Sequence, residues 1–211
     1  MKKFNKLIIA CDGESASGKS TAAKLVSKKY KLLTLNSGLL YRYASKLILN
    51  FKPKNNVIFL KKKFKVISYG KIKNQSLHSE EISNHVAKLA KNKSVRKIIN
   101  HFQKKIIKKN NRICVEGRDI ASKILLKNPK YDIAFYFKCN LYTASKRRWI
   151  DIKKKVPLNV VQNSLKKRTL MDKRRKNSPL IMVKDAILIR TDKLSKKQVL
   201  LKMSKHIDDL N

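Results

Sequence analysis

Apolar positions along the chain fall either into short continuous runs or into segments with a helical repeat. The continuous runs predict buried strands at Leu7–Cys11, Lys31–Leu35, Arg112–Val115, Ile133–Phe137 and Ala186–Ile189. The periodic segments predict helices at Gly18–Lys29, Gly38–Asn50, Leu141–Lys154, Leu158–Asp172 and Ser195–Asp208. Ser195, with Gln198 three residues later, has the pattern of a capping box. Short strands separated by helices predict an α/β fold, in which a five-stranded parallel sheet is covered by helices on both faces.

Two regions depart from this alternation. Phe64–Leu77 resembles a short hairpin and Glu80–Lys109 resembles two helices, so together they predict an insertion over the sheet. The stretch 153–177 is highly basic and helical, with Pro157 near its start, and predicts a mobile lid. We therefore expect a single domain over 1–211, with a core of 1–50, 110–150 and 180–211, an insertion of about 51–109 and a lid of about 153–177.

The chain of 211 residues is 42% hydrophobic, enough for a packed interior. No run of eighteen apolar residues occurs, so we expect no membrane-spanning helix, and we expect a cytoplasmic protein. The three cysteines, Cys11, Cys114 and Cys139, are widely spaced. Such spacing predicts neither a disulfide framework nor a metal site, and small buried residues near strand ends are the expected alternative.

The formal net charge of +40 is the most unusual property of the composition, with 53 Lys and Arg against 13 Asp and Glu. A selected surface for polyanions would explain it. However, the lysines are spread along the whole chain, and abundant Asn and Ile fit the compositional bias of an AT-rich genome. Because aromatic platforms also look scarce, we expect that nucleic-acid binding is not the main function.

The sequence GESASGKS, residues 13–20, fits the phosphate-binding spacing G-x-x-x-x-G-K-[ST]. It lies between a predicted strand and a predicted helix, which is the context that this loop requires. Lys19 is expected to reach the β- and γ-phosphates of ATP and Ser20 to offer its hydroxyl to Mg²⁺. Backbone N–H groups and the helix N-terminus complete the cradle. The nucleotide-binding residues predicted here are Gly13, Glu14, Ser15, Ala16, Ser17, Gly18, Lys19, Ser20 and Thr21.

Three further motifs have the character of a phosphoryl-transfer site. Ser37 and Arg42 lie at and just inside a predicted helix start, where a hydroxyl and a guanidinium suit a second phosphate. The stretch EGRD, residues 116–119, follows an apolar strand directly, and ligands bind at the carboxyl ends of parallel strands. Finally, the spacing of four and three residues places these lid residues on one helix face: Arg168, Asp172 and Arg175.

Together these pieces resemble the bacterial cytidylate kinases, which are P-loop nucleoside monophosphate kinases. The matching stretches are DGESASGKST, NSGLLYR, VRKII around Arg96, EGRD and the lid stretch ending RRKNSPL, in the order and spacing of the family. The resemblance covers essentially the whole chain. It implies transfer of the γ-phosphoryl group of ATP to CMP or dCMP in pyrimidine nucleotide metabolism, with Mg²⁺, an insertion that binds the monophosphate, and a monomeric enzyme.

The resemblance also implies roles for individual residues. Catalytic roles fall on Lys19, Arg118, Arg168 and Arg175, and the metal contact on Ser20. The monophosphate nucleotide is expected to be bound by Ser37, Arg42, Arg96, Arg118, Asp119, Asp172 and Arg175. No general base is required, because the acceptor is already a phosphate anion and needs only alignment and charge neutralisation.

Four positions depart from the family pattern: Asn36, His78, Ala87 and Met171. Ala87 and His78 bear on the selectivity for the base, so an enzyme with a broader specificity that also accepts UMP fits these departures. The sequence leaves two alternatives to a CMP/dCMP kinase. One is a P-loop kinase for another nucleoside monophosphate, and the other is a basic nucleic-acid-binding protein that retains a nucleotide fold.

Overall fold

The computed structural model describes residues 4–210, and the chain forms two compact units. The core unit comprises Met1–Leu35 and Asn110–Asn211, and the helical unit comprises Asn36–Lys109. The division expected from the sequence, with an insertion at 51–109 and a lid at 153–177, describes functional roles and stays a prediction.

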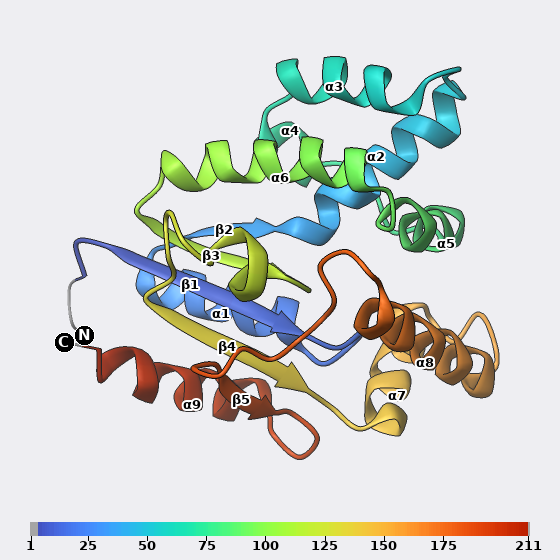
Figure 1. Ribbon diagram of the computed structural model, residues 1–211. Coiled ribbons are helices and arrows are strands. Elements are labelled where there is room, and N and C mark those ends of the chain that lie inside the picture. Colours follow the sequence, from blue (N-terminus) through green and yellow to red (C-terminus); the bar gives the residue numbers. More distant parts are fainter. Residues whose placement is uncertain (1–3, 211) are drawn as a thin grey trace. The chain divides into compact units, whose positions relative to one another are not determined.

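The central feature of the core unit is a five-stranded sheet in the order β2-β3-β1-β4-β5 (Figure 1). Its strands are β1 (Leu7–Gly13), β2 (Leu33–Asn36), β3 (Arg112–Gly117), β4 (Ile133–Lys138) and β5 (Ile187–Arg190). The middle strand β1 pairs in parallel with both β3 and β4, and Asp12 lies opposite Gly117 and Tyr136. The predicted α/β fold with a five-stranded parallel sheet is therefore confirmed, and three carboxyl strand ends meet at one edge.

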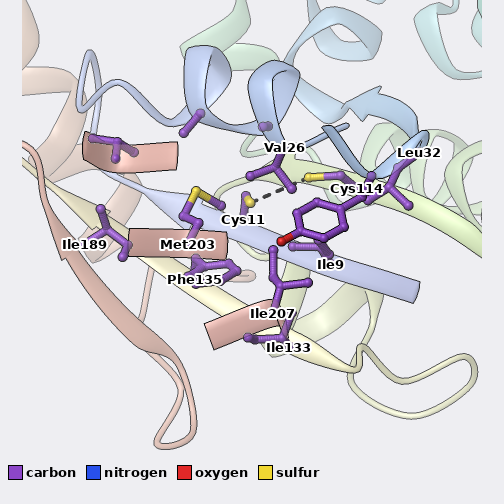
Figure 2. Packing of buried hydrophobic residues seen from close by; sticks show 14 of the residues in the cluster. Ile9, Cys11, Val26, Leu32, Cys114, Ile133, Phe135, Ile189, Met203 and Ile207 are labelled. Atoms are coloured by element: carbon purple, nitrogen blue, oxygen red, sulfur yellow. Dashed lines mark hydrogen bonds between the residues drawn. The ribbon is translucent and has the colours of Figure 1, made fainter. Parts of the chain in front are cut away.

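Two helices, α1 (Lys19–Tyr30) and α9 (Lys196–Asp208), pack on one face of this sheet. Alternate β1 residues contribute to the cluster in Figure 2, where Ile9 and Cys11 lie with Val26, Met203 and Phe135. Cys11 and Cys114 are both buried and reduced, with their sulfur atoms 3.7 Å apart. Cys139 is buried as well, so the expectation of small buried cysteines is confirmed. The Cys114 thiol and burial raise the pKa of the Cys11 thiol well above its ordinary value.

The remaining elements of the core unit are a π-helical turn, η1 (Ile120–Ile124), and the helices α7 (Leu141–Asp151) and α8 (Leu158–Arg174). Several boundaries differ from the predicted ones for local reasons. β2 starts at Leu33 because Lys31 is in the left-handed conformation that ends α1. Lys153 and Lys154 are also left-handed and lie beyond the end of α7. The capping box at Ser195 and Gln198 is present as predicted.

The helical unit contains α2 (Ser37–Phe51), α3 (Asn56–Val66), α4 (Tyr69–Lys73), α5 (Glu80–Leu89) and α6 (Lys93–Lys108). The two helices expected within Glu80–Lys109 are confirmed. The hairpin expected at Phe64–Leu77 is wrong, since this stretch forms the end of α3 and α4. Asn55 caps α3 by accepting the N–H groups of Val57 and Ile58, which favours a helical start. Phe64 then packs edge-on against the rings of Tyr43 and Phe102.

Across residues 4–210, no helix is long and apolar enough to cross a bilayer.

Candidate functional site

The loop between β1 and α1 needs glycine at both ends. A side chain at Gly13 would place its Cβ 2.4 Å from the Phe137 carbonyl oxygen, so β4 leaves no room for one. Gly18 has φ +83° and forms the N-cap of α1, which has no side-chain cap. Inside the loop the Ser17 hydroxyl donates to the Glu14 carbonyl at 2.9 Å. The helix N-terminus therefore faces the loop with its positive end, as an anion-binding turn requires.

Lys19 and Ser20, the first two residues of α1, both contact one carboxylate. The Lys19 ammonium lies 3.1 Å from Glu116 Oε2, and the Ser20 hydroxyl donates to the same oxygen at 2.5 Å. Burial lowers the pKa of Lys19, and the neighbouring Glu116 opposes that shift. Glu116 itself is buried at the end of β3. Although it stands in the EGRD stretch, it was given no role from the sequence. The signal in the sequence that could have identified Glu116 is its position at the carboxyl end of an apolar strand.

Asp12, the residue before Gly13, fixes the loop that follows β3. Its carboxylate accepts the N–H groups of Ile120 at 2.9 Å and Ala121 at 2.8 Å. Burial raises the pKa of Asp12 to about 6, although these two hydrogen bonds favour the charged form. Asp12 thereby positions the backbone just after Arg118 and Asp119. No role was predicted for Asp12 from the sequence, because an aspartate before a loop glycine is common in turns.

The C-terminal end of α8 is joined to this loop by ion pairs. Arg118 Nε donates to Asp172 Oδ2 at 3.0 Å, and Arg175 lies 3.3 Å from Asp172 Oδ1. Arg175 also approaches Asp119 at 3.8 Å. These residues, which lie up to 57 positions apart in the sequence, form one network of alternating charge. Arg175 follows the end of the helix and reaches this network from an extended segment. The expectation that it shares a helix face with Arg168 and Asp172 is therefore wrong, because the helix ends at Arg174.

A separate ion pair connects α8 directly to the phosphate loop. The Lys173 ammonium lies 2.7 Å from Glu14 Oε1. In the same region, the Arg118 guanidinium donates to the Ser15 hydroxyl at 3.4 Å. Arg168 lies half-buried on α8, one helical turn before Asp172. The core unit therefore brings the phosphate loop together with four residues named from the sequence, Arg118, Asp119, Asp172 and Arg175.

Two residues support the loop from the side of β5. The Thr191 hydroxyl donates to the Ser17 carbonyl at 2.8 Å. The Arg147 guanidinium donates to the Thr191 hydroxyl at 2.9 Å and to the Thr191 carbonyl at 2.6 Å. Thr191 is buried just after β5 and Arg147 lies on α7. Neither residue was predicted, because nothing in the local pattern links positions 147 and 191 to the loop.

The helical unit holds the other predicted binding residues. Ser37 is the first residue of α2 and is buried. Arg42, one turn further along, is also buried and donates through Nη1 to the Leu77 carbonyl and the Ser83 hydroxyl, both at 3.0 Å. Ser83 in turn donates to the Ser79 carbonyl at 2.8 Å. Since a hydroxyl has one proton, Ser83 accepts from Arg42 and orients its guanidinium.

Arg96 is fixed in the same unit by backbone and aromatic contacts. It is buried on α6, donates to the Ala90 carbonyl at 3.2 Å and lies over the Tyr41 ring at 5.5 Å. Tyr41 belongs to α2, so Arg96 is held against the helix that carries Ser37 and Arg42. Ala87 is half-buried on α5, a helix that belongs to the same unit.

Glu116 and Ser20 also fit a magnesium ion. Glu116 Oε1 is buried, and it is among the described side-chain oxygens that have no hydrogen-bond partner. Carboxylate and hydroxyl oxygens are the hard ligands that Mg²⁺ prefers, and such sites usually complete the shell with water and phosphate oxygens. Within residues 4–210, no cluster of three His, Cys, Asp or Glu side chains could hold a metal alone.

Comparison with known sequences gives a consistent result. A sequence model of cytidylate kinase matches residues 9–209. Cytidylate kinase from Bartonella tribocorum is 32% identical over 203 residues, which cover 92% of this chain and 90% of that protein. Cytidylate kinase from Clostridium botulinum (strain Hall) is 31% identical over 211 residues, covering 92% and 94%. The bifunctional pantoate ligase/cytidylate kinase of Prochlorococcus marinus (strain AS9601) is 32% identical, and the match spans only 42% of its length.

Solved structures support the fold. A crystal structure of an uncharacterized protein from Eubacterium ventriosum has a TM-score of 0.59 at 19% identity, covering 97% of this chain and 99% of that one. Shikimate kinase from Bacteroides thetaiotaomicron has a TM-score of 0.52 at 7% identity, covering 96% and 98%. The sequence match over residues 9–209, together with the phosphate loop and its network, shows that this chain belongs to the cytidylate kinase family.

Proposed function

We propose that this chain transfers the γ-phosphoryl group of ATP to CMP or dCMP, which gives ADP and CDP or dCDP. The observation that carries the proposal is the arrangement around Glu116. A phosphate loop ends in Lys19 and Ser20, both residues contact this one buried carboxylate, and Arg118 follows it by two positions. Membership in the cytidylate kinase family supports the choice of acceptor.

Residues of the core unit would bind ATP, the phosphoryl donor. The loop amides from Gly13 to Thr21 and the N-terminus of α1 would hold the phosphates of ATP. Lys19 would leave Glu116 and place its ammonium on the β- and γ-phosphates, where negative charge develops during transfer. Mg²⁺ bound by Ser20 and Glu116 would neutralise part of the charge on the same phosphates.

For the acceptor, we propose that the monophosphate nucleotide would be bound by Ser37, Arg42, Arg96, Arg118 and Asp119. An oxygen of its α-phosphate forms a bond to the γ-phosphorus, and the bond from that phosphorus to the β–γ bridging oxygen breaks. No proton has to be removed from the attacking oxygen, so alignment and charge neutralisation supply the catalysis.

The end of α8 would act as the lid. Arg168 and Arg175 would contribute positive charge to the transferring group, and Asp172 would contact the acceptor nucleotide. In the structure Asp172 already connects Arg118 and Arg175. We propose that nucleotide binding exchanges these ion pairs for contacts to phosphate and sugar oxygens, which excludes water from the phosphoryl group.

A coupled kinase assay with ATP and Mg²⁺ tests the proposal by offering CMP, dCMP, UMP, AMP and GMP in parallel. We expect turnover with CMP and dCMP well above the purine nucleotides. Activity with UMP as well would keep the mechanism and broaden the substrate class, in line with the departures at Ala87 and His78. Equal or absent turnover with all five acceptors would overturn the proposal.

A further inference from the structure

The helical unit carries a strong and uneven positive charge. Residues 36–109 contain nineteen Lys and Arg and two acidic residues, both of which lie in the segment 80–81. Residues 36–79 therefore contain no negative side chain. The residues proposed to bind a nucleotide here are Ser37, Arg42 and Arg96, so most of the lysines have no role in the proposed reaction.

Helix α2 leads into α3 by a short connection (Figure 1). Two aromatic rings lie close together near this connection, of which Phe51 is exposed and Phe59 half-buried. The Phe51 ring at the end of α2 is 59% exposed and lies 5.5 Å from the Phe59 ring at a tilt of 47°. The Lys63 ammonium is close to both rings, at 5.1 and 5.5 Å from their centroids. An exposed aromatic ring with cationic groups beside it offers a flat surface for stacking together with positive charge for an anion.

Further lysines surround this pair. We define the basic–aromatic face by the rings Phe51 and Phe59 and by the lysines around them, of which all but Lys63 are exposed: Lys52, Lys54, Lys61, Lys62 and Lys63. The opposite side of α3 is buried through Leu60 and Phe64, so the face belongs to a helix that is anchored in the unit. The sequence indicated that exposed aromatic platforms are scarce, and Phe51 is one ring that the structure exposes.

We propose that this face binds single-stranded nucleic acid, with the lysines along the phosphates and a base stacked on Phe51. Single strands present both partners at once, a regular line of negative charge and unpaired bases. An anionic lipid surface fits less well, because Lys61, Lys62 and Lys65 lie between the exposed apolar residues Ile58 and Val66 of α3. This binding is independent of the proposed phosphoryl transfer.

Fluorescence anisotropy of a labelled 20-nucleotide oligo(U) at several salt concentrations tests the proposal. Phe51→Leu keeps an apolar side chain but removes the ring, and we expect affinity to fall about tenfold. Lys61→Gln with Lys62→Gln should lower the slope of log affinity against log salt by about 1.4, because each neutralised phosphate contributes about 0.7 to that slope. The matched control, Lys196→Gln with Lys197→Gln, changes two exposed adjacent lysines of α9 and should leave affinity within about twofold.

Several results would overturn the proposal. These are no oligo(U) binding by the unaltered protein, wild-type affinity in Phe51→Leu, or an equal loss in both double-lysine variants. The last result would show binding by net charge alone. Vesicles of phosphatidylglycerol and phosphatidylcholine provide the competing measurement, and vesicle binding that requires Phe51 without oligo(U) binding would assign the face to membranes. Turnover with CMP, measured for each variant, reports correct folding separately.

Discussion

A single buried carboxylate organises the reactive end of the phosphate loop. Glu116 binds Lys19 and Ser20 through one oxygen and has a second, buried oxygen without a hydrogen-bond partner. Leaving a buried acceptor unsatisfied is unfavourable unless another ligand uses it. We therefore infer that Glu116 is poised to exchange its contact with Lys19 for contact with Mg²⁺ when ATP binds.

Glu116→Gln tests this role, since it keeps the shape of the side chain and removes its charge. We expect turnover to fall by on the order of a hundredfold, with a higher Mg²⁺ concentration needed for half-maximal rate. Steady-state rates across a Mg²⁺ titration provide the measurement, and Glu81→Gln is the control, because Glu81 is exposed on α5. Wild-type turnover and an unchanged Mg²⁺ requirement in Glu116→Gln would contradict the inference.

The buried Asp12 predicts an unusual pH dependence of stability. Burial raises its pKa from 3.8 to about 6, so the folded protein binds this proton more tightly than the unfolded chain does. The contribution of Asp12 to the free energy of unfolding should therefore fall as the pH rises from about 3 to about 7, by up to about 3 kcal/mol in all.

Urea unfolding of the wild type and of Asp12→Asn at pH 4, 5, 6 and 7 measures that contribution. We expect the stability advantage of the wild type over the variant to be greatest at pH 4 and to decline as the pH rises through 6 to 7. The same comparison with Asp209→Asn, an exposed position, should show no such decline. An advantage that is constant or grows with pH would show that Asp12 is not buried as described.

At the scale of elements, two charged residues near the end of α8, Asp172 and Lys173, should contribute unequally to turnover. Asp172 is 17% exposed and contacts two arginines, whereas Lys173 is 44% exposed and contacts Glu14 alone. We expect Asp172→Asn to lower kcat/KM for CMP about 30-fold or more. Lys173→Gln should lower it less than about fivefold, and the loss should shrink at high salt. The reverse order of the two effects would refute this ranking.

The packing of α5 on α2 should affect the binding of CMP through Ser83. Because Ser83 accepts from Arg42, Ser83→Ala should loosen that guanidinium while the bond to the Leu77 carbonyl stays. We expect KM for CMP to rise about tenfold with kcat changed less than about twofold. Ser83→Thr, which restores the hydroxyl, should recover most of the affinity, and Ser94→Ala at an exposed position of α6 should change neither constant. A loss in kcat alone would argue against a positioning role.

At the scale of the whole molecule, the sequence predicted the sheet, its helices and the phosphate loop because each has a local pattern. Apolar runs mark β1, β3 and β4, and glycine spacing marks the loop between β1 and α1. The error at Phe64–Leu77 arose because its alternating residues fit a strand. Packing of Phe64 between Tyr43 and Phe102 favours a helix instead, and such distant contacts are not visible in a local pattern.

The same limit applies to the candidate site. Residues with a distinctive motif, such as Lys19 and Arg118, could be predicted. The support from Thr191 and Arg147 could not, because it depends on side chains brought together by the order of the strands. The double use of Glu116 is likewise a property of the fold, since β3 and α1 must pack before one carboxylate can contact both Lys19 and Ser20.

The central claim is that this chain moves the γ-phosphoryl group of ATP onto a cytidine monophosphate. The most direct test incubates the protein with ATP labelled at the γ-phosphorus, Mg²⁺ and CMP, and then separates the products. We expect the label in CDP, and we expect its transfer to be abolished in Lys19→Met, which keeps the length of the side chain without its charge. Label that appears only in inorganic phosphate, or that stays in ATP, would contradict the account.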